Sequence, residues 1–217
     1  MMGVVLCIFG EIKNLKTMKK LIYLSLVSIF CSIYSSAQND ILTRKCSSKE
    51  LEPNNCGYIN SSGKIIIPFG KYTYCFTEKF DKMAIVSLKD KPGYYAIDRK
   101  ENILFEVLGY DNAPDKLCEG LVRIKKDGKI GFANENGEII IQPQFEAAMP
   151  FSKGYSAVCI GGTLAKDGEY DIRVNGKWGL INKNGGVVVK VIYEDLRNIN
   201  GEIKVKENKI WKSISIE

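Results

Sequence analysis

The chain has 217 residues, of which 31 are Lys or Arg and 25 are Asp or Glu, and it contains no histidine. The lack of histidine excludes Ser–His and Cys–His nucleophile systems and removes the most common general base and metal ligand. Because the basic side chains are dispersed along the chain, the sequence does not predict the clustered basic face of a nucleic-acid-binding protein.

The first 37 residues have the layout of an export signal. Residues 18–20 form a basic start, residues 21–34 are an apolar run, and Ala37 ends a stretch of small residues typical of a cleavage site. We therefore predict a signal peptide over residues 1–37 with cleavage near Ala37. The mature chain is then periplasmic or secreted and carries a net charge of +3.

Residues 1–17 do not fit the signal. We interpret them as a mis-assigned start, with the signal beginning at Met18, and a genuine extension is the alternative. The apolar run has 14 residues, fewer than the roughly 20 that a membrane-spanning helix needs, so no stable membrane span is predicted in the mature chain. A membrane-anchored form and lipidation at Cys31 are the alternatives to simple export.

One pattern occurs four times in the predicted mature domain, residues 38–217. Each copy has a lead Asn or Asp, a short turn and an aliphatic triplet, and the lead residues are Asn60, Asp98, Asn134 and Asn182. They are 38, 36 and 48 residues apart, a period typical of repeat architectures.

The first copy predicts a disulfide. Residues 41–45 are its expected starting strand and the hairpin partner begins near Cys56, so Cys46 and Cys56 flank the base of one hairpin loop. Facing residues there lie about 4.5 Å apart between Cα atoms, which a disulfide tolerates. We predict the Cys46–Cys56 bond, with two unpaired thiols as the alternative. The mature chain has five cysteines, an odd number, and the pairing of Cys75, Cys118 and Cys159 stays open.

The third copy shows the expected unit most clearly. Residues 120–125 alternate with a period of two, which predicts a half-buried strand with Val122 and Ile124 inside and Arg123 on the other face. Two further strands follow up to residue 142, and an irregular link over residues 145–153 leads to the next copy. Each unit is therefore predicted to be a three-stranded antiparallel meander.

One such meander cannot bury its apolar face alone, so neighbouring meanders must stack. The inward positions of the starting strands hold a small or mid-sized residue and then a branched one: Ala84 and Val86, Val122 and Ile124, Ser156 and Val158, Ile203 and Val205. We predict an all-β fold of tandem three-stranded antiparallel meanders stacked in an open, curved or elongated repeat array. A closed β-propeller-like arrangement is the alternative, although propeller blades usually hold four strands.

The middle strand carries the most characteristic residues. Lys177-Trp178-Gly179 leads into Leu-Ile-Asn, and residues 55–60 and 129–134 align with this segment, whereas the second copy has Tyr95 in place of the glycine. Together with the aliphatic triplet and a later Phe-Ser-Lys-Gly, the pattern over residues 41–217 resembles the WG (tryptophan–glycine) repeat of bacterial exported proteins. The resemblance implies a β-rich repeat that is seldom tied to a defined chemistry.

Two features of this strand have a structural interpretation. Trp178 is predicted to fill the core at the join between units, with an exposed stacking platform for a sugar as the alternative. Gly57, Gly131 and Gly179 are predicted to admit a close backbone approach or a bulge. At the end of the chain, residues 209–217 repeat the middle-strand pattern and are predicted to cap the stack, with Trp211 closing the apolar seam.

The 48-residue spacing indicates an insertion, residues 161–175, in the hairpin loop of the fourth copy. Insertions in repeat arrays often lie on the binding face, so the predicted binding residues are Tyr170, Asp171 and Arg173 in the insertion and Tyr155 before it. A longer ordinary hairpin is the alternative. We predict no metal site, because the cysteines lack zinc-site spacing; a weak calcium site on the acidic side chains of the insertion is a minor alternative.

These features predict an exported, non-catalytic scaffold without a cofactor, which binds a protein or a cell-envelope component. A carbohydrate-binding module using Tyr155, Tyr170 or Trp178 is the first alternative, and a two-carboxylate glycoside hydrolase is the second. The acidic residues of the connectors are expected on the solvated surface: Glu78, Asp81, Asp111, Asp115 and Glu119.

Overall fold

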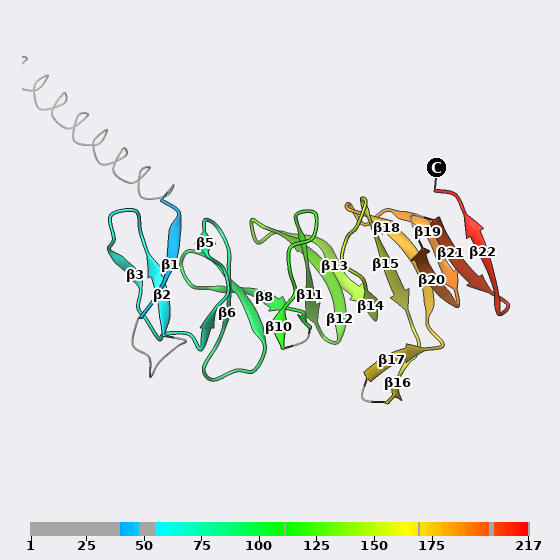
Figure 1. The fold of residues 1–217 in the computed structure, drawn as a ribbon, viewed down its shortest axis with the longest axis horizontal. Coiled ribbons are helices and arrows are strands. Elements are labelled where there is room, and N and C mark those ends of the chain that lie inside the picture. Colours follow the sequence, from blue (N-terminus) through cyan, green and yellow to red (C-terminus); the bar gives the residue numbers. More distant parts are fainter. Residues whose placement is uncertain (1–39, 48–54, 111, 169, 200–201, 217) are drawn as a thin grey trace, which may run out of the picture. The chain divides into compact units, whose positions relative to one another are not determined.

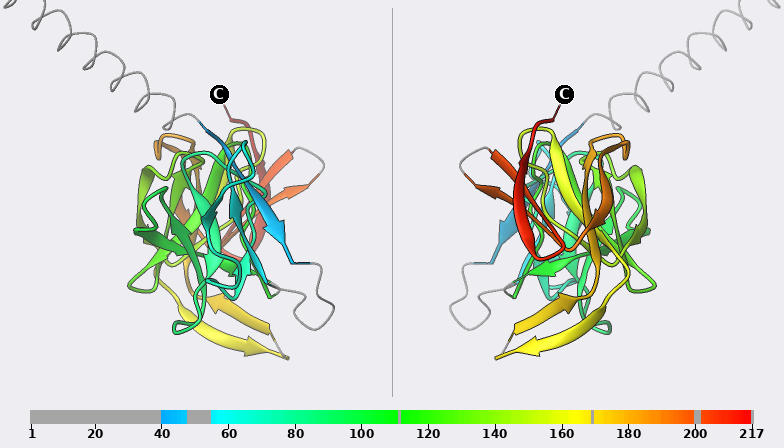
Figure 2. Two further views of the ribbon diagram at one scale, coloured as in Figure 1. Left: turned by 90° about the vertical axis from the view of Figure 1, so that its left-hand side faces the viewer. Right: turned by 90° about the vertical axis from the view of Figure 1, so that its right-hand side faces the viewer.

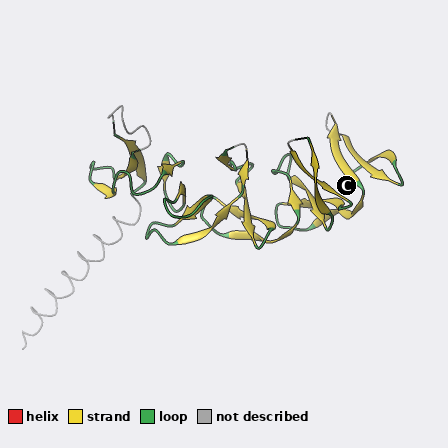
Figure 3. Ribbon diagram, turned by 90° about the horizontal axis from the view of Figure 1, so that it is seen from below, coloured by secondary structure: helices red, strands yellow, loops and turns green. Residues whose placement is uncertain are grey.

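The computed structural model describes residues 40–47, 55–110, 112–168, 170–199 and 202–216. The chain separates into a unit of Met1–Ile41 and a unit of Leu42–Glu217. The predicted signal peptide and its cleavage site lie outside the described residues, so both stay predictions. The described part consists of strands and loops, with no helix (Figure 3). None of its elements is therefore a helix with the length and apolarity that a membrane crossing requires.

The described residues form 22 strands in six antiparallel sheets, none of which closes on itself (Figure 1). The first sheet has the order β3 (Ile65–Ile67), β2 (Cys56–Ile59), β1 (Leu42–Cys46), β5 (Lys79–Phe80). The largest has the order β13 (Ile139–Phe145), β12 (Lys129–Asn134), β11 (Leu121–Lys126), β8 (Ile103–Val107), β7 (Tyr94–Ile97), β6 (Ala84–Ser87), β4 (Tyr74–Cys75).

The remaining sheets follow in the second half of the chain. A four-stranded sheet has the order β14 (Ala147–Ala148), β15 (Tyr155–Ile160), β18 (Lys177–Asn182), β19 (Val187–Tyr193). The terminal sheet consists of β20 (Asp195–Ile199), β21 (Glu202–Glu207) and β22 (Ile210–Ile214). Two strand pairs stand alone: β9 (Gly109–Tyr110) with β10 (Ala113–Pro114), and β16 (Thr163–Asp167) with β17 (Tyr170–Val174).

The predicted three-stranded meander is present in all four copies. It consists of β1–β2–β3, β6–β7–β8, β11–β12–β13 and β15–β18–β19, and the terminal sheet supplies the start of a fifth. The prediction of purely irregular links is wrong. β4, β14 and β20 pair with β6, β15 and β21, so a short segment within each of these links adds an edge strand to the following copy.

The turns that define the repeat share one hydrogen bond. The side-chain oxygen of the lead residue accepts the backbone N–H four positions later, at 3.0 Å from Glu138 to Asn134. The same bond measures 2.8 Å at Asn60, Asp98 and Asn182. A short polar side chain that closes its own turn explains why each copy begins with Asn or Asp.

In the second copy, Glu101 occupies the turn position that is glycine elsewhere, and its φ of 65° lies in the left-handed region. Its carboxylate accepts a hydrogen bond from the Tyr72 hydroxyl at 2.6 Å and an ion pair from Lys71 at 2.7 Å. Partial burial acts to raise the pKa of Glu101, but these two donors lower it below its ordinary value. The contacts offset a backbone conformation that only glycine adopts without strain.

The buried apolar side chains form four clusters, one between each pair of successive copies and one between the fourth copy and the terminal sheet. All eight predicted inward residues are buried: Ala84, Val86, Val122, Ile124, Ser156, Val158, Ile203 and Val205. The prediction of a half-exposed strand is wrong for β11. Its other face is also covered, since Leu121 packs with the fourth copy and Arg123 is only 9% exposed. An interior copy has a neighbour on both sides, so both of its faces are buried.

The glycines of the middle strand admit the predicted close approach. A Cβ at Gly131 would lie 2.4 Å from the Ile141 carbonyl oxygen, and Gly57 and Gly179 are equally crowded. The partner strand bulges there. Ile130 faces Phe145 whereas Phe132 faces Ile141, so β13 advances by four residues over a stretch in which β12 advances by two.

The second copy lacks this bulge. Tyr95 replaces the glycine and pairs directly with Glu106, so β7 and β8 stay in register from Tyr94 to Ala96, and the only shift along this pair lies between Ala96 and Ile97. The second edge of this in-register part of β8 pairs with β11, where Val107 faces Ile124. This pairing joins the second and third copies into the seven-stranded sheet.

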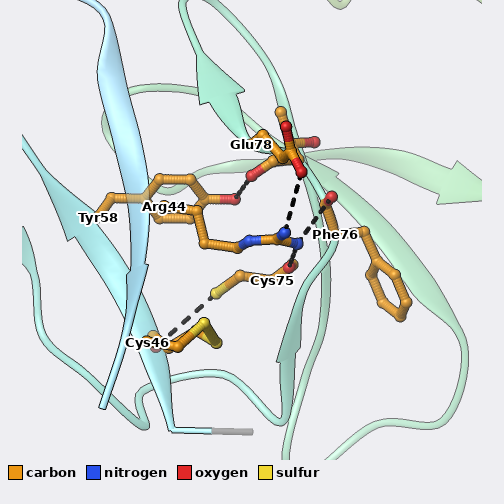
Figure 4. A network of polar contacts seen from close by, with 8 residues as sticks. Arg44, Cys46, Tyr58, Cys75, Phe76 and Glu78 are labelled. Atoms are coloured by element: carbon orange, nitrogen blue, oxygen red, sulfur yellow. Dashed lines mark hydrogen bonds and ion pairs between the residues drawn. A yellow bond between two sulfur atoms is a disulfide. The ribbon is translucent and has the colours of Figure 1, made fainter. Parts of the chain in front are cut away.

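The contact between the first two copies is polar as well as apolar (Figure 4). The Arg44 guanidinium donates to the carbonyls of Cys75 and Phe76, at 2.8 and 3.2 Å, and lies 3.4 Å from the Glu78 carboxylate. Close by, β1 and β2 bring Cys46 opposite Cys56 with their Cα atoms 3.9 Å apart, and the two are joined by a disulfide.

The end of the stack differs from its prediction in one respect. β22 forms the predicted last strand, but Trp211 does not close the apolar seam and is 37% exposed. It pairs with Lys206, on the face opposite Ile203 and Val205, and lies under the Arg197 guanidinium at 4.8 Å from the ring centroid. Ile214 and Ile216 pack against the last core cluster instead.

Candidate functional site

Aromatic pairs fill two of the contacts between copies. Tyr58 of β2 meets Phe80 edge to face, with ring centroids 5.2 Å apart. Phe132 of β12 meets Phe151 in the same way at 4.7 Å. In both pairs one ring follows the middle-strand glycine, and the other comes from the link to the next copy. A large side chain from each partner therefore closes the space between the sheets.

The contact between the fourth copy and the terminal sheet has no such pair. Leu180 follows the middle-strand glycine, and the sequence from Leu196 to Ile203 contains no aromatic residue. A cavity of about 580 Å³ opens here. Its lining from the fourth copy and the link before it consists of Met149, Pro150, Ser152, Lys153, Tyr155, Ala157 and Leu180. The terminal segment contributes Leu196, Arg197, Asn198, Ile203 and Ile216.

The floor of the cavity is apolar. Leu180, Leu196 and Ile203 belong to the last core cluster and are 3%, 9% and 8% exposed, and Ala157 and Ile216 pack against them. Tyr155, from the first position of β15, also packs against this cluster and is half-buried. The cavity is thus a gap in the hydrophobic seam and not a polar surface cleft.

Two of the described lining residues are charged, Lys153 and Arg197, and both are basic. The Arg197 side chain is turned outward, because its guanidinium pairs with Asp195 at 3.0 Å and lies over Trp211. Lys153 lies in the turn before β15, where its φ of 54° is left-handed. No carboxylate among the described residues forms an ion pair with Lys153. The rim near Lys153 is therefore locally positive.

A carboxylate from the third copy holds this turn in place. Glu119 accepts the backbone N–H of Gly154 at 2.9 Å and pairs with Lys183 at 3.3 Å. The hydrogen bond from Gly154 and the ion pair with Lys183 hold the pKa of Glu119 below its ordinary value. Glu119 therefore fixes the backbone from which Lys153 projects.

The predicted insertion forms the hairpin β16–β17, whose strands pair from Thr163 with Val174 to Asp167 with Tyr170. It forms its own sheet and extends away from the sheets of the repeat (Figure 2, yellow). Leu164 on this hairpin is 65% exposed. The insertion is thus an element added to the array and is not part of its core.

The structure does not bring the four predicted binding residues together. Tyr155 lines the cavity at the first position of β15, whereas the hairpin follows the last position, Ile160, about 17 Å away along an extended strand. The Arg173 guanidinium donates to the Gly162 carbonyl at 3.1 Å, at the base of the hairpin. The side chains of Tyr170 and Asp171 are not among those that the structure describes. Tyr155 and the hairpin residues therefore belong to separate regions.

Trp178 is half-buried and packs against the last core cluster, as the core-filling interpretation predicts. In β18 it pairs with Cys159 on one side and Tyr193 on the other. Its indole therefore lies at the edge of the last core cluster.

The expectation of solvated connector carboxylates is wrong for Asp115, which is 8% exposed. It forms a two-point ion pair with Arg123, with bonds of 2.7 Å from Nη2 to Oδ1 and 3.0 Å from Nε to Oδ2. Glu78 and Glu119 also pair with basic side chains, while Asp111 lies outside the described residues. Among the described residues no three His, Cys, Asp or Glu side chains are grouped to hold a metal ion.

The cavity is the feature that sequence reasoning missed. Its signal was only partly readable: two copies place an aromatic side chain after the middle-strand glycine and a second one in the following link, but the second copy has Ala96 at the first of these positions. The fourth copy and the terminal segment do neither. The insertion and Tyr155 were found from the spacing and the strand pattern.

Comparison with known protein families gives three matches to the WG containing repeat, at residues 57–91, 130–163 and 178–209. Each matched segment begins at or next to the middle-strand glycine and runs into the next starting strand. The matches leave out the copy with Tyr95 and Glu101, whose strand pairing also departs from the others. No curated protein matches the chain. The repeated meanders and these matches agree, and the chain belongs to the WG containing repeat family.

Proposed function

We propose that this chain is an exported, non-catalytic scaffold that binds a protein or another cell-envelope component through the inserted hairpin β16–β17. The observation that carries the proposal is the separateness of this hairpin, which forms its own two-stranded sheet outside the repeat sheets. A two-stranded hairpin is at best marginally stable by itself and adds little to the stability of the stack. Its contribution lies in the surface that it presents.

The position of the hairpin supports a binding role. In the third copy, Lys126 pairs with Lys129 across the two-residue turn Asp127-Gly128. In the fourth copy, Ile160 pairs with Lys177 at the equivalent place, and residues 161–176 stand where the third copy has its two-residue turn. The array itself needs only a tight turn here, and binding surfaces of repeat proteins often lie on such insertions.

The hairpin also has a defined base. Arg173 bonds the carbonyls of Gly161 and Gly162, and Gly176 leaves no room for a Cβ beside the Cys159 sulfur, 2.3 Å away. These contacts fix the base of the hairpin beside the end of β15, so a partner would meet an element with a defined attachment.

The test replaces residues 161–176 with Asp-Gly, which copies the turn of the third copy. Cross-linking in the native periplasm should capture a reproducible partner with the parent chain and lose it with the shortened variant, while the melting temperature stays the same. Tyr170→Ala with Arg173→Ala should weaken capture, and Lys125→Met, on β11, serves as the control. Equal capture by the parent and shortened chains would refute the proposed face.

Export is tested separately, by sequencing the amino terminus of the chain from the periplasmic or secreted fraction. A mature chain that begins close after Ala37 is the expected result. A chain retained with residues 1–37 in the cytosol would contradict it.

A further inference from the structure

We propose that the cavity between the fourth copy and the terminal sheet binds an amphiphilic carboxylate, a ligand with an apolar body and a single anionic head. This inference is independent of the hairpin, since the cavity lies at the other end of β15. It assigns the apolar body to the floor around Leu180 and Ile203 and the head to Lys153.

The first step is the origin of the space. Where Tyr58 meets Phe80 and Phe132 meets Phe151, two rings fill the gap between successive sheets. Leu180 takes the place of the first ring at the last contact, and no aromatic side chain follows in the link. This contact thus lacks the ring pair that fills two of the other contacts, and an apolar ligand can restore the missing contacts.

The second step is the character of the walls. The volume of about 580 Å³ lies within the range of small-molecule sites, roughly 300–1,000 Å³. Its floor is formed by side chains of the last core cluster, including Leu180 at 3% and Ile203 at 8% exposure. Burial of an apolar chain against such a floor contributes about 25 cal/mol per Å² of area removed from water. The body of the ligand is therefore apolar.

The third step is the charge of the rim. Among the described residues no Asp or Glu lines the cavity, and the Arg197 guanidinium is already engaged by Asp195 and Trp211. Lys153 is the lining cation without an ion-pair partner among the described residues, and its turn is held by the bond from Gly154 to Glu119. One uncompensated cation beside an apolar floor is complementary to a single negative charge. The Ser152 hydroxyl and the Tyr155 ring complete the rim without adding charge.

The test is calorimetric titration of the full chain with three ligands that share a ten-carbon body and differ in the head: decanoate, decan-1-ol and decyltrimethylammonium. All are used below their aggregation concentrations. Decanoate should bind with one-to-one stoichiometry and about twofold to fivefold more tightly than the alcohol, because Lys153 is exposed and an exposed ion pair contributes little. The ammonium compound should bind most weakly.

Two kinds of variant separate the head from the body. Lys153→Met should remove this preference for decanoate over decan-1-ol, while the binding of the alcohol is retained. Leu180→Phe, which gives the fourth copy the residue of the third, should fill the cavity and abolish binding of both. Ala157→Leu is a second filling variant, for use if Leu180→Phe fails to fold. Lys125→Met is the matched control for removal of a lysine.

The outcomes are distinct. Equal affinity for decanoate and decan-1-ol would overturn the assignment of the head, and unchanged binding by the two filling variants would overturn the location. Saturable binding of a neutral monosaccharide in place of decanoate would overturn the ligand class. The chain with residues 161–176 replaced by Asp-Gly should bind decanoate normally. Failure of the hairpin proposal and failure of this one are therefore recognised separately.

Discussion

The ion pair between Asp115 and Arg123 allows a quantitative test of the fold. The two residues are 8% and 9% exposed, and four hydrogen bonds connect them to each other and to the next copy. Three join Arg123 to the Asp115 carboxylate, at 2.7, 2.9 and 3.0 Å, and the fourth runs from Nη1 to the Ala148 carbonyl at 2.9 Å. Arg123→Met removes the guanidinium and leaves a buried carboxylate without its counter-charge.

Removal of one partner of a buried ion pair costs about 3–5 kcal/mol, because the remaining charge stays desolvated. In a domain of 150–250 residues each kcal/mol lowers the melting temperature by about 2–4 °C, so the expected decrease is about 6–20 °C. In the chain that carries Arg123→Met, Asp115→Asn removes the unpaired negative charge and keeps a side-chain oxygen that accepts the backbone N–H of residue 123. The double variant should therefore regain part of the loss.

The assay is urea unfolding followed by circular dichroism, together with thermal melts. The control is Lys204→Met, which breaks the exposed pair with Glu202, 3.5 Å apart, and should cost at most about 1 kcal/mol. The reasoning fails if Arg123→Met and Lys204→Met are equally stable. It also fails if the double variant is no more stable than Arg123→Met alone.

Gly131→Ala should destabilise the chain by about 1–3 kcal/mol in the same unfolding assay, since its Cβ would lie 2.4 Å from a backbone oxygen; an unchanged midpoint would contradict the bulge. Burial raises the pKa of Cys75 to about 11, so native iodoacetamide labelling at pH 8 should modify half-buried Cys118 first; the reverse order would refute this. Tyr72→Phe should cost about 1–2 kcal/mol at pH 7. The pKa of Glu101 is lower in the folded chain than in the unfolded chain. The ionised carboxylate therefore stabilises the fold at pH values above its unfolded-state pKa, and this stabilisation is lost as the pH falls through its folded-state pKa. The cost of Tyr72→Phe should therefore shrink in acid, and a constant cost would exclude the charge-assisted bond.

The sequence predicted the repeat, the meander and the inward side chains, because period-two alternation and turn residues are local signals. Cys46 and Cys56 were placed by the same logic, since they flank one hairpin. Strands such as β14 have two residues and no pattern of their own, so their pairing depends on the neighbouring copy.

The burial of Arg123 was not predictable in the same way. Alternation assigns a residue to one face of a strand but does not say whether another copy covers that face. Asp115, eight residues earlier, reaches Arg123 only after the link has folded back over β11. The cavity is likewise a property of two copies together, although the missing aromatic residues around Leu180 marked its place.

The unshifted pairing of Tyr95 with Glu106 has a consequence for how neighbouring copies are joined. Copies two and three share a continuous backbone ladder, whereas the boundary between β13 and β14 is crossed by side chains such as Phe132, Phe151 and Arg123. The residue at one middle-strand position therefore distinguishes a boundary joined by backbone strand pairing from a boundary joined by side-chain contacts. In a repeat protein of this kind, the choice between glycine and a bulky residue at this position decides whether two neighbouring copies share one sheet or form separate sheets. The length of the repeat does not have to change.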